Sequence, residues 1–293
     1  MTPLDFALVL VSALLHAWWS TRIKASSDPL TFNLLQGGVT LALAAALLPW
    51  VHPAEIPGGV WRWLALTSAA HAAYIYWLSR ALEHGDLTLV YPVARSTPAL
   101  LPLLAVPLFG EPVTPGGAAG IAVVVAGVWL VYAGASLKLR AFATRAARYA
   151  LLTLLATVVY SLADKRAMAG LAAGAWTSPV PRAAAFYCLL AVGHLVPFAA
   201  LVVARRGLRR IAAARGELPL ASLASLVSFA GYGLILRALE TAPASYVVAV
   251  RQASVLFAVA LGVLQLGERP SRARLVGAGA TVAGVALIAF WGG

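Results

Sequence analysis

Two arginines stand where a positive charge is costly. Arg95 and Arg251 are the only basic residues well inside the long apolar segments of this chain. At the centre of a segment that crosses a bilayer, a charge costs roughly 2.5–3.5 kcal/mol, so such residues usually face a bundle interior or a wet cavity. A guanidinium there can bind a carboxylate or a phosphate of a ligand. The alternative is that the arginines pair with freed backbone carbonyls or snorkel from a helix end.

A second group of polar residues follows helical spacing. Thr67, His71 and Tyr74 share one face of a helix, because residues three and four apart are neighbours on its surface. Tyr91 and Arg95 share a face of the next apolar segment. These side chains could converge on one cavity. The alternative, that the tyrosines form aromatic belts at a membrane interface, explains His71 less well because it lies in mid-segment.

The composition indicates that a bilayer is the solvent around these residues. Hydrophobic residues make up 61% of the 293 residues and charged residues 11%, against about 45–50% and 25% in an average soluble domain. Ten apolar segments are close to the roughly 20 residues that cross a bilayer. We expect helices, because no segment alternates with period two. The segments are residues 4–21, 30–50, 60–82, 87–109, 116–135, 149–168, 182–204, 218–239, 245–266 and 274–291.

The chain repeats itself at an offset of 157 residues. Arg80-Ala81-Leu82-Glu83 recurs as Arg237-Ala238-Leu239-Glu240, and Gly110-Glu111 recurs without a gap as Gly267-Glu268. Each copy holds five segments, an odd number, so the two copies must cross the membrane in opposite directions. Such inverted repeats are typical of transporters with a binding site near the midplane.

The same register predicts the relation between the two arginines. Arg95 lies opposite Gln252 and Arg251 lies opposite Ala94. We therefore expect that the two arginines are not symmetry mates. Glycines of the fifth and tenth segments, such as Gly120 and Gly284, are expected to let these two helices approach closely.

Lysine and arginine are unevenly divided between the two sides of this topology. Fifteen lie in the connections after segments 1, 3, 5, 7 and 9, and five lie on the other side. The positive-inside rule places the fifteen in the cytoplasm and both termini outside, in the periplasm of an inner membrane. The net charge of +12 is thus explained by helix anchoring, and no nucleic acid partner is expected. The first segment is expected to stay as a spanning helix, because it lacks the basic start of a cleaved signal.

The recurring residues resemble the drug/metabolite transporter superfamily, specifically its ten-helix members built from two EamA repeats. The resemblance covers nearly the whole chain and predicts repeats over residues 1–136 and 149–293, joined by a basic linker, 137–148. Within the superfamily the chain is most similar to amino-acid exporters of the YddG type, although it lacks the glycine of the commoner Trp-Gly-Ser. The motifs are Trp18-Trp19-Ser20 through Lys24, Pro29-Leu30-Thr31-Phe32, Arg80–Glu83, Pro92 in the fourth segment, and Gly110-Glu111.

This resemblance implies which residues bind substrate. It implies that segments 1, 3, 4, 6, 8 and 9 line a central cavity. An aromatic wall with a few polar tips suits an amphipathic zwitterion. His16 and His194 are interpreted instead as residues that hydrogen-bond between packed helices. The candidate substrate-binding residues are Trp19, His71, Tyr74, Tyr91, Arg95, Tyr160, Ser228, Tyr232, Arg251 and Gln252.

The acidic residues limit the function. All ten are expected at or near a segment end, and none lies inside the first segment, where the small multidrug relatives use a carboxylate for proton-coupled antiport of cations. A cationic drug is therefore disfavoured as substrate. If transport is proton-coupled, His71 or Asp164 must serve, and facilitated diffusion is equally open.

Enzyme chemistry is not expected. The chain has no His-Glu-x-x-His, no intramembrane aspartate pair and no Gly-x-Ser-x-Gly. The single cysteine, Cys188, excludes an intramolecular disulfide framework and an all-cysteine metal site. No cofactor or metal is expected.

The sequence thus predicts an all-α integral membrane protein with ten transmembrane helices, arranged as two inverted five-helix repeats. We expect an alternating-access transporter that exports small amphipathic metabolites, with aromatic or neutral amino acids first. Two alternatives remain: a sugar-phosphate or nucleotide-type exchanger, and a membrane scaffold that transports nothing. The expected partners are a small-molecule substrate and the bilayer, with the chain as monomer or homodimer.

Overall fold

The computed structural model describes residues 1–25, 28–84, 87–133, 143–266 and 270–292, and every regular element within them is helical. The first repeat holds α1 (Pro3–Ala25), α2 (Pro29–Leu47), α3 (Gly58–His84), α4 (Leu87–Ala94), α5 (Thr97–Phe109) and α6 (Pro115–Ala133). The second holds α7 (Arg145–Ala172), α8 (Arg182–Arg206), the short α9 (Leu208–Ala213), α10 (Leu218–Leu239), α11 (Ala244–Val250), α12 (Ala253–Leu266) and α13 (Arg272–Trp291).

These helices form ten membrane spans. Eight stretches of the described residues are long and apolar enough to cross a bilayer. The helices α4 and α5 together make one of these stretches, and α11 and α12 together make another. The other two spans are α1 and α3. The 27 residues of α3 reach about 40 Å at 1.5 Å per residue, although the helix carries Arg62, His71 and Arg80. The expected fold class, an all-α membrane protein built from two five-helix repeats, is confirmed.

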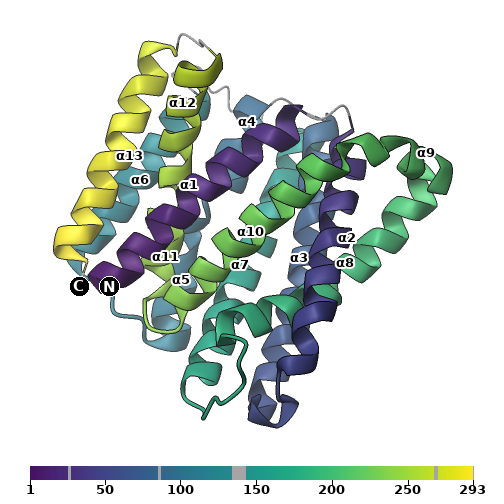
Figure 1. Cartoon of the computed structure of the whole chain (residues 1–293). Coiled ribbons are helices and arrows are strands. Elements are labelled where there is room, and N and C mark those ends of the chain that lie inside the picture. Colours follow the sequence, from purple (N-terminus) through teal and green to yellow (C-terminus); the bar gives the residue numbers. More distant parts are fainter. Residues whose placement is uncertain (26–27, 85–86, 134–142, 267–269, 293) are drawn as a thin grey trace.

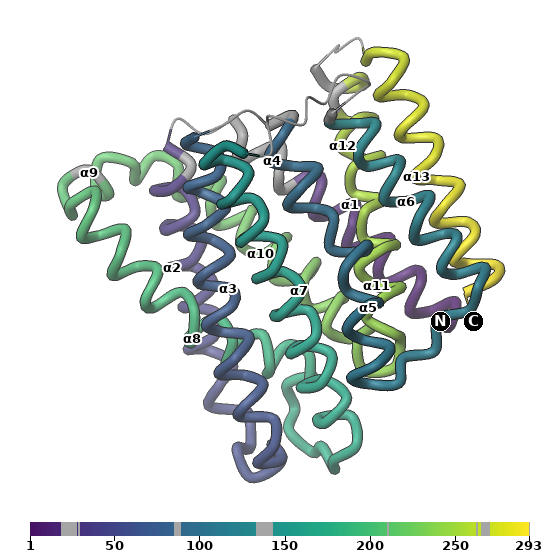
Figure 2. The backbone as a smooth tube through the Cα atoms, turned by 180° about the vertical axis from the view of Figure 1, so that it is seen from behind, coloured from purple at the N-terminus to yellow at the C-terminus, as the bar shows by residue number. Residues whose placement is uncertain are grey.

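Helix packing follows the repeat. α3 packs along α7, and α10 packs along α1, so the third helix of each repeat lies on the first helix of the other. α2 packs on α8 and α6 packs on α13, which pairs equivalent helices directly. Figures 1 and 2 show α6 and α13 at one edge of the bundle, α2 and α8 at the opposite edge, and both termini together at one end. The pattern is that of two inverted copies around a central pseudo-two-fold axis.

The α6–α13 pair is held by glycines, as the sequence predicts. A Cβ added at Gly120 would lie 2.8 Å from the carbonyl oxygen of Gly284, and one added at Gly284 would lie 2.7 Å from that of Gly120. Gly127 and Gly277 face each other in the same way, with the added Cβ 2.7 Å from the opposite carbonyl oxygen. The two backbones therefore touch, and this pair joins the two repeats along one edge.

The fourth span of each repeat is broken in the middle. In the first repeat, the N–H of Ser96 donates to Val93 O at 3.1 Å instead of to Pro92 O, and the Ser96 hydroxyl donates to Pro92 O at 2.7 Å in its place. Pro98, near the start of α5, has no N–H to continue the helical ladder. The break is therefore stabilised by a side chain that satisfies the freed carbonyl.

The second repeat uses the same device with another residue. The N–H of Gln252 donates to Ala249 O at 3.0 Å, and the Gln252 side-chain Nε2 donates to Val248 O at 3.3 Å. No proline is needed here. Because Nε2 of Gln252 donates to Val248 O in its own helix turn, this nitrogen is not directed at the cavity, contrary to the expectation from the sequence.

This hydrogen-bond pattern corrects the expected relation between the arginines. The break follows Ala94 in the first repeat and Val250 in the second, so Arg95 corresponds to Arg251, at an offset of 156 residues. The ungapped register was wrong at this point, because α11 is one residue shorter than α4 and α12 is one residue longer than α5. Two compensating shifts leave no trace in the flanking motifs. The two arginines are symmetry mates.

Candidate substrate cavity

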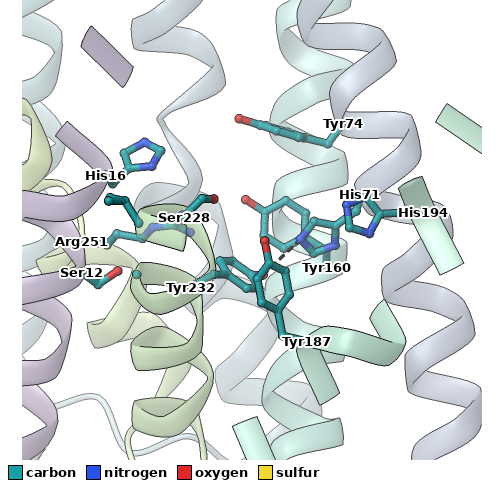
Figure 3. A pocket seen from close by; sticks show the side chains of 12 residues that line it. Ser12, His16, His71, Tyr74, Tyr160, Tyr187, His194, Ser228, Tyr232 and Arg251 are labelled. Carbon is teal, nitrogen blue, oxygen red and sulfur yellow. Dashed lines mark hydrogen bonds between the residues drawn. The ribbon is translucent and has the colours of Figure 1, made fainter. Parts of the chain in front are cut away.

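A cavity of about 130 Å³ lies between the two repeats (Figure 3). Its wall comes from α1, α3, α7, α8 and α10, together with the break between α11 and α12. The inverted packing brings these elements together, because the first and third helices of each repeat cross at the centre. The lining residues are Ser12, His16, His71, Tyr74, Tyr160, Tyr187, His194, Val227, Ser228, Gly231, Tyr232 and Arg251.

Stacked rings form one side of the cavity. The His71 ring stacks on Tyr160 with centroids 4.1 Å apart, and Tyr74 meets Tyr160 edge-on at 5.7 Å. Tyr232 lies edge-on to His71 at 5.7 Å and packs against Tyr187 at 5.2 Å. Such edge-on and offset ring pairs are favourable arrangements of the aromatic quadrupoles. The cavity therefore offers a rigid aromatic surface bearing hydroxyl tips.

Arg251 brings a positive charge into this aromatic cavity. Its guanidinium lies over the Tyr232 ring, 5.5 Å from the centroid, which is a cation–π contact. Among the described residues, no carboxylate lies within salt-bridge distance of it. Its charge is thus held mainly by aromatic and hydroxyl groups and is available to an anionic ligand.

Arg95, the symmetry mate, is used differently. Its Nη1 donates to the Ser254 hydroxyl at 3.1 Å, and its guanidinium lies over the Tyr91 ring at 5.5 Å. Nη2 lies 3.4 Å from Nε2 of His16. Because arginine only donates, this nitrogen of His16 is the acceptor. Arg95 therefore reaches the cavity through His16 and does not line it.

A buried carboxylate stands directly behind the cavity wall. Asp164 of α7 is 0% exposed, and its Oδ1 accepts a hydrogen bond from the Thr67 hydroxyl at 2.6 Å. Its Oδ2 accepts from the hydroxyl of Tyr232, which also lies 3.1 Å from Nε2 of His71. The expectation that every acid sits near a segment end is wrong for Asp164. The helix continues to Ala172, two turns further on.

The structure brings six of the ten candidate residues together in the cavity wall: His71, Tyr74, Tyr160, Ser228, Tyr232 and Arg251. Three candidates lie elsewhere. Tyr91 stacks on Tyr132 of α6 with centroids 5.3 Å apart, Arg95 bonds Ser254, and Gln252 caps Val248. The side chain of Trp19 lies outside the described part of the chain.

Sequence reasoning missed several cavity residues. His16 and His194 were interpreted as packing residues, yet both line the cavity, and His194 lies 5.4 Å from the His71 ring. The principle that an ionisable residue inside a membrane segment marks a functional site would have found both. Ser12 and Tyr187 carry no such signal, because a serine or tyrosine inside an apolar helix is common. In the described residues, no three His, Cys, Asp or Glu side chains are grouped as metal ligands.

Comparison with known proteins identifies the family. The EamA-like transporter family matches this chain twice, over residues 6–133 and 145–290. The chain belongs to this family. This is a family of membrane transporters and not of enzymes, as the sequence predicts, and the chain is a multi-pass membrane protein of that family.

One curated relative of this EamA-like transporter is an uncharacterized transporter in the cobO 3' region of a Sinorhizobium species. The two are 35% identical over 95 residues, which cover 32% of this chain and 66% of the relative, slightly less than two thirds of its length. A protein of known crystal structure superposes with a TM-score of 0.72 at 20% identity, over 98% of this chain and 95% of that chain. At that identity the match shows the fold alone.

Proposed function

We propose that this EamA-like transporter exports amino acids with aromatic or neutral side chains by alternating access. The observation that carries the proposal is the position of Arg251. Its guanidinium lies in a cavity walled by tyrosine and histidine rings and has no carboxylate partner among the described residues. A substrate carboxylate fits the arginine, and an apolar or aromatic side chain fits the rings.

The broken ninth span adds to the attraction for an anion. α12 begins at Ala253, two residues after Arg251, and runs for 14 residues. The N-terminus of a helix carries a partial positive charge, and broken helices of this kind point such termini at anionic groups of substrates. Arg251 and the start of α12 therefore favour the same end of a zwitterion.

A phosphate substrate is less well supported. A phosphate monoester carries about −1.5 to −2 charges at pH 7, and among the described side chains one arginine, Arg251, lines the cavity. Arg95 is held by Ser254 and His16, so it is not free to supply a second cation. The single charge of a carboxylate matches the single guanidinium better.

Alternating access is supported by where the repeats are tied. At the end of the bundle that the positive-inside rule assigns to the periplasm, Glu111 binds the start of α11. At the same end, Glu55 binds Thr177 and Ser178 of the second repeat. Opening towards the periplasm requires such ties to break while the glycine-packed α6 and α13 stay together. In this orientation both termini are periplasmic.

Counterflow in proteoliposomes tests the proposal. Vesicles loaded with an unlabelled amino acid should take up the same labelled amino acid faster than unloaded vesicles. A panel of aromatic, neutral and charged amino acids, with a sugar phosphate and a nucleotide as rivals, defines the substrate class. Uptake of the phosphate compounds alone would overturn the amino-acid assignment.

A further inference from the structure

We infer that Asp164, Tyr232 and His71 form a unit that binds one proton, and that this proton couples to transport. The inference rests on the proposed function, because the coupling partner is the substrate in the cavity. The unit forms part of the cavity wall. Tyr232 and His71 line the cavity, and Asp164 lies behind them with no exposed surface.

The hydrogen bonds of His71 fix its tautomer. Nδ1 lies 2.9 Å from the backbone carbonyl oxygen of Thr67 and 3.1 Å from the Thr67 hydroxyl, which donates its own hydrogen to Asp164. A carbonyl oxygen only accepts, so Nδ1 carries a hydrogen. If His71 is neutral, its Nε2 then carries a lone pair and can only accept a hydrogen bond. This nitrogen lies 3.1 Å from the Tyr232 hydroxyl oxygen. A neutral His71 thus needs the Tyr232 proton.

Asp164 needs the same proton. An ionised carboxylate only accepts, and the Tyr232 hydroxyl is the group in contact with its Oδ2. The hydroxyl has one hydrogen and two neighbours that both require it. With Asp164 ionised and His71 neutral, one of the two contacts would set lone pair against lone pair. A buried contact of that kind is costly.

One additional proton satisfies every contact, in either of two arrangements. In the first, protonated Asp164 donates to the Tyr232 oxygen and Tyr232 donates to Nε2 of His71. In the second, Tyr232 donates to ionised Asp164, and a doubly protonated His71 donates from Nε2 to the Tyr232 oxygen. The two arrangements differ only by shifts of two protons along the same line, and their total charge is equal. The geometry therefore corresponds to the proton-loaded unit.

The groups around the unit complete the electrostatic picture. On the cavity side, the guanidinium of Arg251 lies over the Tyr232 ring, 5.5 Å from its centroid. Lys165, the neighbour of Asp164 on α7, is turned away and donates to Leu239 O at 2.9 Å. The ionisable groups that face the unit from the packed helices are Tyr160 of α7, Tyr187 and His194 of α8, and Arg251 at the α11–α12 break. Tyr91 and Arg95 of the α4–α5 span face each other.

Release of the proton must change the cavity. Without it, the Tyr232 hydroxyl can donate to Asp164 or to His71 but not to both, so either the His71 ring loses its contact or the Tyr232 ring moves away from Asp164. Both rings line the cavity, so the proton state and the shape of the binding site are linked. A substrate carboxylate at Arg251 acts on the same unit by neutralising the adjacent positive charge. Linkage is reciprocal, so substrate and proton change each other's affinity by the same factor.

Asp164→Asn is the informative variant. The asparagine oxygen can accept from Thr67, and its amide can donate to the Tyr232 oxygen, which leaves the Tyr232 proton for His71. The variant therefore copies the loaded arrangement and cannot release the proton. Tyr232→Phe removes the hydroxyl that joins the two ends and serves as a second variant. Glu83→Gln is the matched control, because Glu83 is exposed and its ion pair among the described residues is with Arg80.

The experiment follows proton movement with a pH-sensitive dye inside proteoliposomes while an amino-acid gradient is imposed. The unmodified protein and Glu83→Gln should move protons with the substrate. Asp164→Asn should keep counterflow and lose the proton signal, and Tyr232→Phe should lose the proton signal too. Amino-acid transport without proton movement in the unmodified protein, or an undiminished proton signal in Asp164→Asn, overturns the inference while the proposed function stands.

A second readout separates the two proposals if no amino acid is transported. Infrared difference spectra of the purified protein across a pH titration report protonated carboxyl groups directly. A carboxyl band that titrates in the unmodified protein and in Glu83→Gln, and that is missing in Asp164→Asn, supports the proton-binding unit. Identical spectra for Asp164→Asn and the unmodified protein overturn it.

Discussion

Arg95 and Arg251 occupy the same position in the two repeats, at the residue that follows the first half of a broken span. Arg95 donates its backbone N–H to Tyr91 O at 2.9 Å, and Arg251 donates its own to Val247 O at 3.0 Å. The side chains nevertheless have different tasks. Arg251 faces the cavity, whereas Arg95 bonds Ser254 across the interface between the repeats. Equivalent backbone positions thus carry one arginine that lines the cavity and one that bonds across the interface between the repeats.

This difference predicts unequal effects of neutralising the two arginines. Arg251→Gln should weaken amino-acid affinity by about 1.5–3 kcal/mol, the typical value of a hydrogen bond to a charged group, which is about 10- to 150-fold in Kd. Arg95→Gln should have a smaller effect, because its guanidinium acts through His16. Binding of a labelled amino acid to the purified variants measures both.

The amide of the same amino acid is the control ligand, because it lacks the carboxylate. Arg251→Gln should change the affinity for the amide much less than the affinity for the free acid. Equal losses for the acid and the amide would show that Arg251 supports the fold of the cavity and does not bind the carboxylate.

The sequence predicts the topology well because the bilayer imposes it. Spans of sufficient length and the doubled motifs at an offset of 157 lead to ten helices in two inverted copies, and the described helices follow that plan. The register of the arginines could not be predicted. The one-residue shift before the break is compensated by the end of α12, and the backbone hydrogen bonds at the break reveal it.

Asp164 shows a second limit of the sequence. Hydropathy ended the sixth segment at residue 168, so an acid at 164 belonged to a segment end, but α7 continues to Ala172. The side chain is buried because Thr67 and Tyr232, distant in sequence, supply its hydrogen bonds. A hydrogen-bond partner on another helix cannot be inferred from the spacing of residues along a single sequence.

Two glycine-to-alanine substitutions in the α6–α13 pair should distinguish the effect of close helix packing on stability from the effect of helix propensity. A Cβ at Gly127 would lie 2.5 Å from the Thr281 hydroxyl oxygen and 2.7 Å from Gly277 O. Gly127→Ala should therefore lower the free energy of unfolding by about 1–3 kcal/mol, the usual cost of overpacking. Thermal unfolding in detergent measures the change.

Gly279→Ala is the matched variant on α13, because a Cβ there meets nothing within 4 Å. It should be neutral or slightly stabilising, since alanine is favoured over glycine inside a helix by about 1 kcal/mol. If both variants were equally destabilised, close approach of the two helices would not be the reason for the glycines.

The Glu55 tie between the repeats should weaken only in acid. Its carboxylate accepts from the N–H and hydroxyl groups of both Thr177 and Ser178. The Thr177 hydroxyl above all, then the Ser178 and His52 bonds, hold the pKa of Glu55 well below its usual value. A carboxyl whose pKa is lowered in the folded state stabilises it above its unfolded pKa, about 4.3 for glutamate, and loses that effect as the pH falls towards the folded value.

Thermal unfolding of the unmodified protein and of Glu55→Gln, from neutral pH down to pH ~3, which lies below the usual glutamate pKa, tests this. The difference between their midpoints should be constant at neutral pH and shrink in acid. Glu83→Gln, which alters an exposed pair, serves as the control. A difference that grows as the pH falls would contradict the direction of the pKa shift.

Glu111 should be the most sensitive of the polar ties. It is 7% exposed, and its oxygens accept from the N–H of Ala244 at 2.7 Å, from the N–H of Ser245 at 3.1 Å and from the Ser245 hydroxyl at 2.7 Å. The residue before α11 is Pro243, whose side chain cannot cap the helix. Glu111 therefore provides the N-cap of α11 from another helix connection.

Glu111→Ala leaves the two buried N–H groups at the start of α11 without an acceptor, and each such group costs about 1–3 kcal/mol. Ser245→Ala removes only the hydroxyl bond and should cost about 0.5–1.5 kcal/mol. Unfolding in detergent should rank Glu111→Ala well below Ser245→Ala in stability. Because α11 carries Arg251 at its end, Glu111→Ala should also weaken amino-acid binding, whereas Ser245→Ala should not. Equal stability of the two variants would mean that water replaces the carboxylate at this helix end.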